Sequence, residues 1–104
     1  MRVYISGKIT GDPNFFDKFK KWEKYLQEKG FATMNPAYNC MLMPLAEYEE
    51  YMELSFHELS MCDAIFMLPD WKMSSGARQE NCYAYIHGIQ IIEKSERENG
   101  GEIE

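Results

Sequence analysis

The segment "SSGARQE" places a carboxylate, Glu80, four residues after a glycine at the start of a predicted helix. On that helix Ala77, Glu80 and Ala84 lie at i, i+3 and i+7, so they share one face. The alanines are small enough for this face to lie against a sheet, with Glu80 in the first two turns. The helix N-terminus stabilises a carboxylate there, whereas partial burial raises its pKa. Glu80 is therefore a candidate for carboxylate chemistry. The alternative is a first-turn acid that bonds a backbone amide or complements the helix dipole.

Side chains that commonly bind metals are few and scattered. The three cysteines, Cys40, Cys62 and Cys82, form no CxxC pair, and only two histidines are present. We therefore expect no zinc site and no disulfide framework. We also expect no cofactor. Cysteines are usually buried, so the three are expected to be buried free thiols.

The elements that must position Glu80 alternate between strand and helix. The expected strands are short apolar or β-branched runs, at residues 2–6, 31–36, 63–68 and 89–92. Three helices are expected, each with apolar residues at helical spacing. The first is capped by Asp12, has Pro13 at its first position and ends at Gly30. The second begins at Pro44 and reaches Leu59, and the third runs from about Ser75 to His87. Residues 37–43 are expected to form an apolar loop.

This order predicts an α/β fold: a three-layer α/β/α sandwich with a mainly parallel four-stranded sheet, flavodoxin- or Rossmann-like. We expect the strand order 2-1-3-4, with a topological switch between the first and third strands. Ligands bind there beyond the carboxyl ends of the strands, where "SGKITGDPN" and "PDWKMSSG" would meet. Residues 1–93 are expected to form one domain, followed by an acidic, frayed tail at 94–104.

The charge and hydropathy of the chain argue against two classes of partner. Acidic residues outnumber basic ones, 17 to 11, for a net charge of −6. Nonspecific nucleic-acid binding needs basic side chains, so it is not expected, although backbone amides can still hold a small anion. No apolar run approaches the roughly 20 residues that span a bilayer, and "MRVYISGKIT" does not resemble a signal peptide. We therefore expect a cytoplasmic protein without a membrane partner.

Three stretches resemble the nucleoside 2-deoxyribosyltransferase superfamily, and most closely its small, poorly characterised bacterial and phage members. "VYISGKITG" is similar to the opening strand and loop of that family. "CDAIFMLPDW", followed by "SSGAxxE", is similar to its central strand and the helix that carries the nucleophile. "AYIHGIQII" is similar to its closing helix and strand. The resemblance covers roughly residues 1–92 and rests on the order and spacing of these stretches.

The resemblance implies that Glu80 is a nucleophile. In that family a glutamate attacks the anomeric carbon of a nucleoside or nucleotide, the base leaves, and the sugar passes to another base or to water. A carboxylate suits this chemistry because it can attack an oxocarbenium-like carbon and leave again. The resemblance therefore implies a 2-deoxyribosyltransferase or N-glycosidase acting on a small nucleoside or nucleotide.

The same resemblance implies further site residues, each with a structural alternative. Tyr4 would help to orient the nucleophile, unless it is simply a packed strand aromatic. The implied substrate-binding residues are Gly7 and Gly11 by close backbone approach, Asp70 from the end of the third strand, Trp71 by stacking on a base, and Ser75 and Gly76 by hydroxyl and amides at the helix N-terminus. Each of these residues also has a purely structural alternative. Gly7 and Gly11 could be ordinary turn glycines, and Asp70 an ordinary loop carboxylate. Trp71 could be an exposed or interface tryptophan, and Ser75 a helix N-cap.

One departure from the family pattern leaves the function open. Active relatives carry an aspartate as general acid or base eight residues before the aspartate that begins the third strand. Counting back from Asp63 gives Ser55, which cannot supply a proton near neutral pH. Either Asp70 substitutes, or the chain is a catalytically weak nucleotide-binding or sensing module.

A receiver-like interaction domain is disfavoured because no acidic pair follows the first strand, and "GKITG" is not a P-loop. The abundance of Met and Tyr around "NCMLMP" favours a homo-oligomer, with a dimer as the default, although these side chains could instead pack internally.

Overall fold

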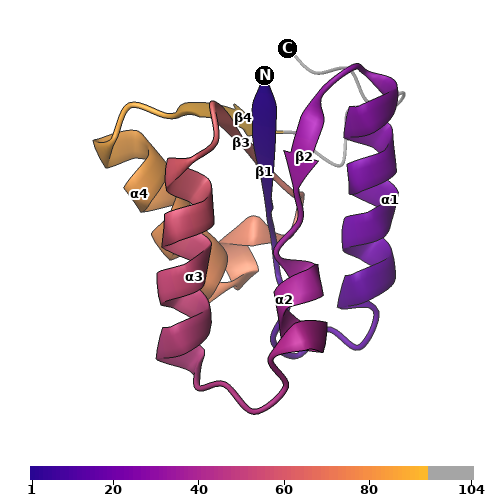
Figure 1. Cartoon of the computed structure of the whole chain (residues 1–104), viewed down its shortest axis with the longest axis vertical. Coiled ribbons are helices and arrows are strands. Elements are labelled where there is room, and N and C mark those ends of the chain that lie inside the picture. Colours follow the sequence, from indigo (N-terminus) through magenta and orange to yellow (C-terminus); the bar gives the residue numbers. More distant parts are fainter. Residues whose placement is uncertain (94–104) are drawn as a thin grey trace.

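The computed structural model describes residues 1–93, which form a four-stranded, all-parallel sheet (Figure 1). The spatial order is β2-β1-β3-β4, with bounds Arg2–Ser6 for β1, Ala32–Met34 for β2, Ala64–Met67 for β3 and Gln90–Glu93 for β4. The expected α/β fold and the strand order 2-1-3-4 are both confirmed. The central strands β1 and β3 are nearly continuous runs of buried residues, as expected for strands covered on both faces.

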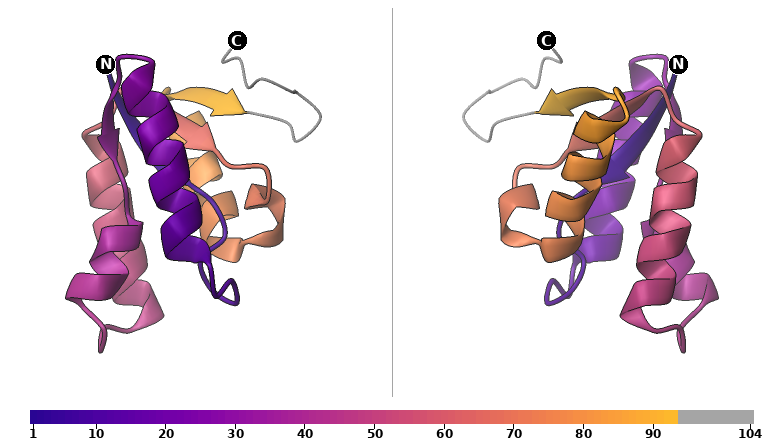
Figure 2. Two further views of the ribbon diagram at one scale, coloured as in Figure 1. Left: turned by 90° about the vertical axis from the view of Figure 1, so that its right-hand side faces the viewer. Right: turned by 90° about the vertical axis from the view of Figure 1, so that its left-hand side faces the viewer.

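Helices cover both faces of the sheet and make three layers (Figures 1 and 2). The helices are α1 (Phe15–Glu28), α2 (Ala37–Leu42), α3 (Tyr48–Ser60) and α4 (Ser75–Ile86), with a short 3-10 turn, η1 (Trp71–Met73). On one face, Val3 and Ile5 of β1 pack with Phe19 and Leu26 of α1. On the other, α3 and α4 lie side by side over the sheet (Figure 2).

The alternation of side chains along β1 decides which residues can meet the helix that carries Glu80. Val3 and Ile5 point toward α1, so Tyr4 and Ser6 point toward α3 and α4. Tyr4 pairs in register with Ile65 of β3, which lies in the same buried cluster as Tyr4. The sheet therefore presents a phenol and a hydroxyl to the α3–α4 layer.

The connection between β2 and α3 differs from the expected one. Residues 37–43 do not form a loop, because Ala37–Leu42 is the helix α2. The side chain of Asn35 accepts a hydrogen bond from the Ala37 amide (2.9 Å), which satisfies one of the free amides at the start of this helix. Pro44 does not open α3. That helix begins at Tyr48 after a capping box between Glu47 and Glu50.

The start of α1 also differs from the expected one. The helix begins at Phe15 with Asn14 as N-cap, rather than at Pro13 behind a cap by Asp12. The carboxylate of Asp12 instead accepts from the Asn14 amide (2.9 Å) and binds Lys18. Gly30, the expected terminator of this helix, has the positive φ of +95° that such a position requires.

Two further expectations concern the ends of the chain and its surroundings. The predicted frayed tail, residues 94–104, lies outside the described residues. Within residues 1–93, every helix is too short or too polar to cross a bilayer.

Candidate functional site

Glu80 is buried at the interface between α4 and the sheet, with only 6% of its surface exposed. The Tyr4 hydroxyl donates to its Oε2 (2.7 Å), and the Ser6 hydroxyl donates to its Oε1 (2.6 Å). Each carboxylate oxygen therefore has its own donor from β1. This pair of short hydrogen bonds fixes the plane of the carboxylate relative to the sheet.

The local sequence explains how a carboxylate comes to lie so deep. Ala77 and Ala84, on the same face of α4 as Glu80, are buried against the sheet. Their short side chains let the helix approach β1 and β3 closely, which brings Glu80 within reach of Tyr4 and Ser6. The expectation that Glu80 lies on the sheet-facing side of its helix is confirmed.

Burial is the dominant electrostatic effect on Glu80 and raises the pKa of its carboxyl to about 7. Hydrogen bonds from Ser6, Tyr4 and Ser55 lower this pKa, and the charge of Glu58 raises it. Burial, followed by the charge of Glu80, raises the pKa of Tyr4 well above its usual value. Tyr4 therefore stays a hydrogen-bond donor, while Glu80 is divided between its acid and carboxylate forms near neutral pH.

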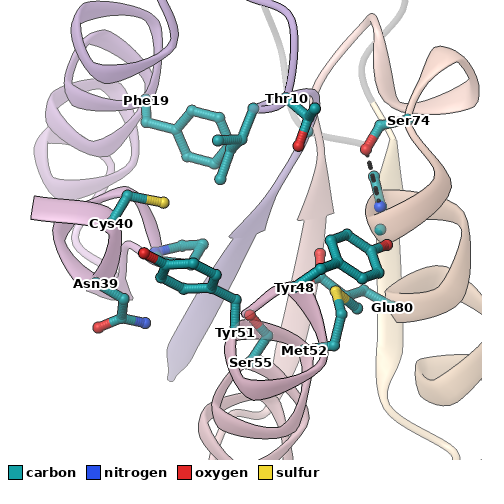
Figure 3. A pocket seen from close by; sticks show the side chains of 15 residues that line it. Thr10, Phe19, Asn39, Cys40, Tyr48, Tyr51, Met52, Ser55, Ser74 and Glu80 are labelled. Atoms are coloured by element: carbon teal, nitrogen blue, oxygen red, sulfur yellow. Dashed lines mark hydrogen bonds between the residues drawn. The ribbon is translucent and has the colours of Figure 1, made fainter. Parts of the chain in front are cut away.

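Glu80 lies at the wall of a cavity of about 170 Å³ (Figure 3). Five segments line the cavity: Gly7, Ile9 and Thr10 after β1; Phe19 of α1; Pro36, Asn39 and Cys40 at α2; Tyr48, Tyr51, Met52 and Ser55 of α3; and Ser74, Gly76, Ala77 and Glu80 at α4. Sites for drug-sized ligands usually enclose about 300–1,000 Å³. The cavity therefore suits one ring-sized group beside Glu80, and a larger ligand would extend through its mouth.

Three of the residues implied as substrate-binding or catalytic line this cavity, namely Gly7, Gly76 and Glu80. Tyr4 lies behind the carboxylate and holds it. A Cβ at Gly7 would lie 2.7 Å from Cδ1 of Leu68, so this position has no room for a side chain. A Cβ at Gly76 would lie 3.3 Å from Sδ of Met52.

The other implied substrate-binding residues do not line the cavity. Asp70 accepts from Nζ of Lys18 (2.5 Å) and from the Lys8 amide (3.1 Å). The indole of Trp71 donates to Oε2 of Glu93 (2.7 Å) and packs against the cluster beneath α4. Gly11 occupies a turn with φ +83°.

Ser75 is also outside the cavity, and it is not the cap of α4. The N-cap is Ser74, whose Oγ accepts from the Ala77 amide (3.1 Å). Oγ of Ser75 instead accepts from Nε2 of Gln79 (3.3 Å), on the exposed side of the helix.

Several cavity residues were missed by the sequence argument. Ser6 could have been found, because it follows Tyr4 by two positions on a strand and must share its face. Tyr48 and Tyr51 lie in the first turn of α3, and the sequence favoured them as part of a self-association surface rather than as site residues. In Figure 3 their rings point to opposite sides of the cavity, Tyr48 toward the first turns of α4 and Tyr51 toward Asn39 and Cys40.

The cysteines only partly match the expectation of burial. All three are free thiols, but Cys62 alone is buried, Cys40 is half-buried at the cavity wall, and Cys82 is exposed on α4. Cys82 falls on a face of α4 that looks away from the sheet, which is why the general tendency of cysteines to be buried fails there. Within the described part of the chain, no group of three or more His, Cys, Asp or Glu side chains is arranged to hold a metal ion.

Comparison with known proteins gives a family but no activity. Residues 1–93 match a family described as a domain of unknown function, DUF4406. None of the curated proteins compared with the chain matches it. The match covers every described residue, including β1, α4 and the whole cavity, and the chain therefore belongs to the DUF4406 family.

Proposed function

We propose that the chain cleaves or transfers the N-glycosidic bond of a nucleoside or nucleotide through a covalent intermediate on Glu80. The observation that carries this proposal is the buried Glu80 carboxylate at the cavity wall, held by Tyr4 and Ser6. A nucleophile must be kept in one orientation relative to the carbon that it attacks. Two donors on a central strand provide that restraint.

In the proposed reaction, a carboxylate oxygen of Glu80 forms a bond to the anomeric carbon as the carbon–nitrogen bond breaks. The base leaves with the electron pair of that bond and takes up a proton from water at the cavity mouth. Water or a second base then attacks the same carbon and gives up a proton, and the Glu80 carboxylate leaves with its electrons. Hydrogen bonds from Tyr4 and Ser6 stabilise the carboxylate when it is released.

A second candidate is a nucleotide-binding or sensing module with weak catalysis, and one observation favours it. Glu80 is the only acidic residue among those that line the cavity in the described chain. Ser55 occupies the wall where relatives are expected to carry an acid, and Asp70 is bound to Lys18 outside the cavity. Protonation of the leaving base by a side-chain carboxylic acid therefore has no candidate in the cavity itself.

The test is a chromatographic assay for free base with deoxynucleosides and their monophosphates. We expect base release by the wild-type chain and a loss of at least about 100-fold in Glu80→Gln, because the amide cannot act as the nucleophile. Glu53→Gln, an exposed carboxylate on α3, is the matched control and should retain activity. Dependence of the rate on added base distinguishes transfer from hydrolysis.

A mass measurement identifies the intermediate directly. Acid-quenched wild-type protein should carry the mass of one sugar on the peptide that contains Glu80, and Glu80→Gln should not. Saturable binding of the same compounds without base release would select the binding module. If no compound either binds or turns over, both proposals fail.

We also propose that the chain self-associates. Large apolar side chains lie exposed where α2 joins α3, and Leu45 has 94% of its surface exposed; the others are Met41 and Leu42. Such patches are common at protein interfaces. Sedimentation equilibrium distinguishes a monomer of 12.3 kDa from a dimer, and a monomer at all concentrations would refute this proposal.

A further inference from the structure

The ammonium group of Lys18 has three oxygen acceptors from different parts of the chain. Its Nζ lies 2.6 Å from Oδ2 of Asp12, 2.5 Å from Oδ2 of Asp70 and 2.7 Å from the backbone oxygen of Lys8. An ammonium group has three donors, so these contacts use all of its hydrogen-bonding capacity. The three side chains are only 20–25% exposed, which limits screening by solvent.

These contacts join three elements at one point. Lys18 belongs to α1, Asp70 follows β3, and Lys8 and Asp12 belong to the loop between β1 and α1. Asp70 strengthens the junction, because its Oδ1 accepts from the Lys8 amide (3.1 Å). The loop is thereby tied at both of its ends to a single ion cluster.

The same loop forms one wall of the cavity. Gly7, Ile9 and Thr10 line it, and all three lie between Ser6, which holds Glu80, and Asp12, which binds Lys18. The loop carries two glycines, and the φ of +83° at Gly11 marks its turn. Glycines give a loop conformational freedom, so its position depends on contacts such as those of Lys18.

We propose that Lys18 is a positioning residue for the cavity, which acts through Asp12 and Asp70 to hold the Gly7–Gly11 loop against the site of Glu80. Lys18 itself is not among the residues that line the cavity. Asp70 has the same role, which differs from the contact with sugar or base that the family resemblance implies. This inference deepens the proposed function, but two of its three tests need no ligand.

The first test is amide hydrogen exchange in Lys18→Met, which keeps the length of the side chain and removes its charge and donors. The Lys8 amide and those of the following loop should exchange about ten- to a hundredfold faster, as expected from the loss of charged hydrogen bonds. Amides of β3 and α4 should be unchanged. Lys24→Met, at an exposed lysine of the same helix, should change nothing. Lys18→Arg keeps the charge but not the threefold arrangement of donors. Its exchange rates at these amides should therefore lie between those of the wild type and of Lys18→Met.

The second test uses the reactivity of the Cys40 thiol, which lies at the cavity wall, to measure how accessible the cavity is. In a Cys82→Ser background, which removes the exposed thiol, Lys18→Met should raise the rate of Cys40 alkylation by iodoacetamide several-fold. Lys24→Met should leave that rate unchanged.

The third test applies to any deoxynucleoside from which the wild-type chain releases base. Lys18→Met should raise KM more than it lowers kcat, because the wall moves while Glu80 and its donors remain. Unchanged exchange at Lys8, a uniform rise across the whole chain, or an unchanged rate at Cys40 would each overturn the positioning role. Absence of any turnover would overturn the proposed reaction alone, because the first two tests still decide the role of Lys18.

Discussion

At Glu80, burial and hydrogen bonding act on one carboxylate in opposite directions. Burial dominates and brings the pKa to about 7, while Ser6 gives the largest of the opposing contributions. A nucleophilic carboxylate must be ionised, so the fraction of competent protein rises as the pH passes through this value. Burial of Glu80, opposed by the hydroxyl groups of Tyr4 and Ser6 on β1, therefore sets the pH range of the proposed reaction.

The expected pH profile follows from this balance. In the wild-type chain, kcat/KM for base release should rise with pH and level off above about pH 7. Ser6→Ala removes a donor to the charged form, so the midpoint should move to higher pH. Profiles measured from pH 5 to 9 on both proteins check this. A midpoint that does not move, or that falls, would contradict the assigned role of Ser6.

At the scale of single residues, the sequence was informative where regular periodicity applies. Glu80 could be placed because the helical period fixes which side chains share a face. Tyr4 became a candidate only through the family resemblance. Asp70 and Trp71 follow a strand in a segment without a period. Their positions depend on contacts with Lys18 and Glu93, which lie 52 and 22 residues away. No local pattern encodes partners so distant in the chain.

Among the elements, the N-terminal turn of α4 affects both the stability of that helix and the shape of the cavity. Gly76 lies in that turn, and its lack of a side chain leaves the space between Met52 and the hydroxyl of Tyr48 open. Glycine within a helix costs about 1 kcal/mol of stability relative to alanine. Its presence here therefore favours the cavity at the expense of the helix.

Gly76→Ala should separate these two effects. The new Cβ would approach Sδ of Met52 to 3.3 Å, a contact that a flexible side chain can relieve. The free energy of unfolding should therefore change little or rise by up to about 1 kcal/mol, while ligand affinity falls because the methyl group narrows the cavity. Urea unfolding and a binding titration measure the two effects. Gly7→Ala is the contrasting variant, and it should lose about 1–3 kcal/mol through its clash with Leu68.

Prediction of the elements succeeded for the sheet and failed around α2. The strands are short apolar runs between clear turn residues, and α4 has a sharp face and a glycine after it, so their order could be predicted. The helix α2 has six residues, and its first amide is satisfied by Asn35 rather than by a typical cap residue of its own. The capping box at Glu47 uses a glutamate in place of the usual Ser or Thr. Pro44, a typical first residue of a helix, therefore gave the wrong start for α3.

For the molecule as a whole, the carboxylate of Glu80 couples folding to pH. Its pKa is about 7 in the folded chain, against an ordinary value of 4.5, so the folded state holds this proton more tightly. The stabilising contribution is complete below about pH 4.5 and is lost as the pH rises through about 7. Keeping the Glu80 carboxylate ionised and buried therefore lowers the free energy of unfolding at and above neutral pH.

Glu80→Gln should remove that dependence. Between pH 5 and pH 8, the free energy of unfolding of the wild-type chain should fall by about 2 kcal/mol relative to that of the variant. Urea unfolding of both proteins at the two pH values measures this difference. Glu53→Gln, at an exposed position, should follow the wild type. If the free energies of unfolding of wild type and Glu80→Gln change equally with pH, burial does not raise the pKa of the Glu80 carboxyl.

The placement of β1 beside β3 also bears on how the chain is made. Val3 pairs with Ala64, so the two central strands cannot join until more than sixty residues have left the ribosome. Tyr4 and Ser6 are synthesised first but receive Glu80 only when α4 arrives behind β3. Closing so long a segment is entropically costly, and contacts of this kind slow folding. In a nascent chain, the edge of β1 that pairs with β3 therefore stays open until β3 emerges, and the site is completed only when α4 follows.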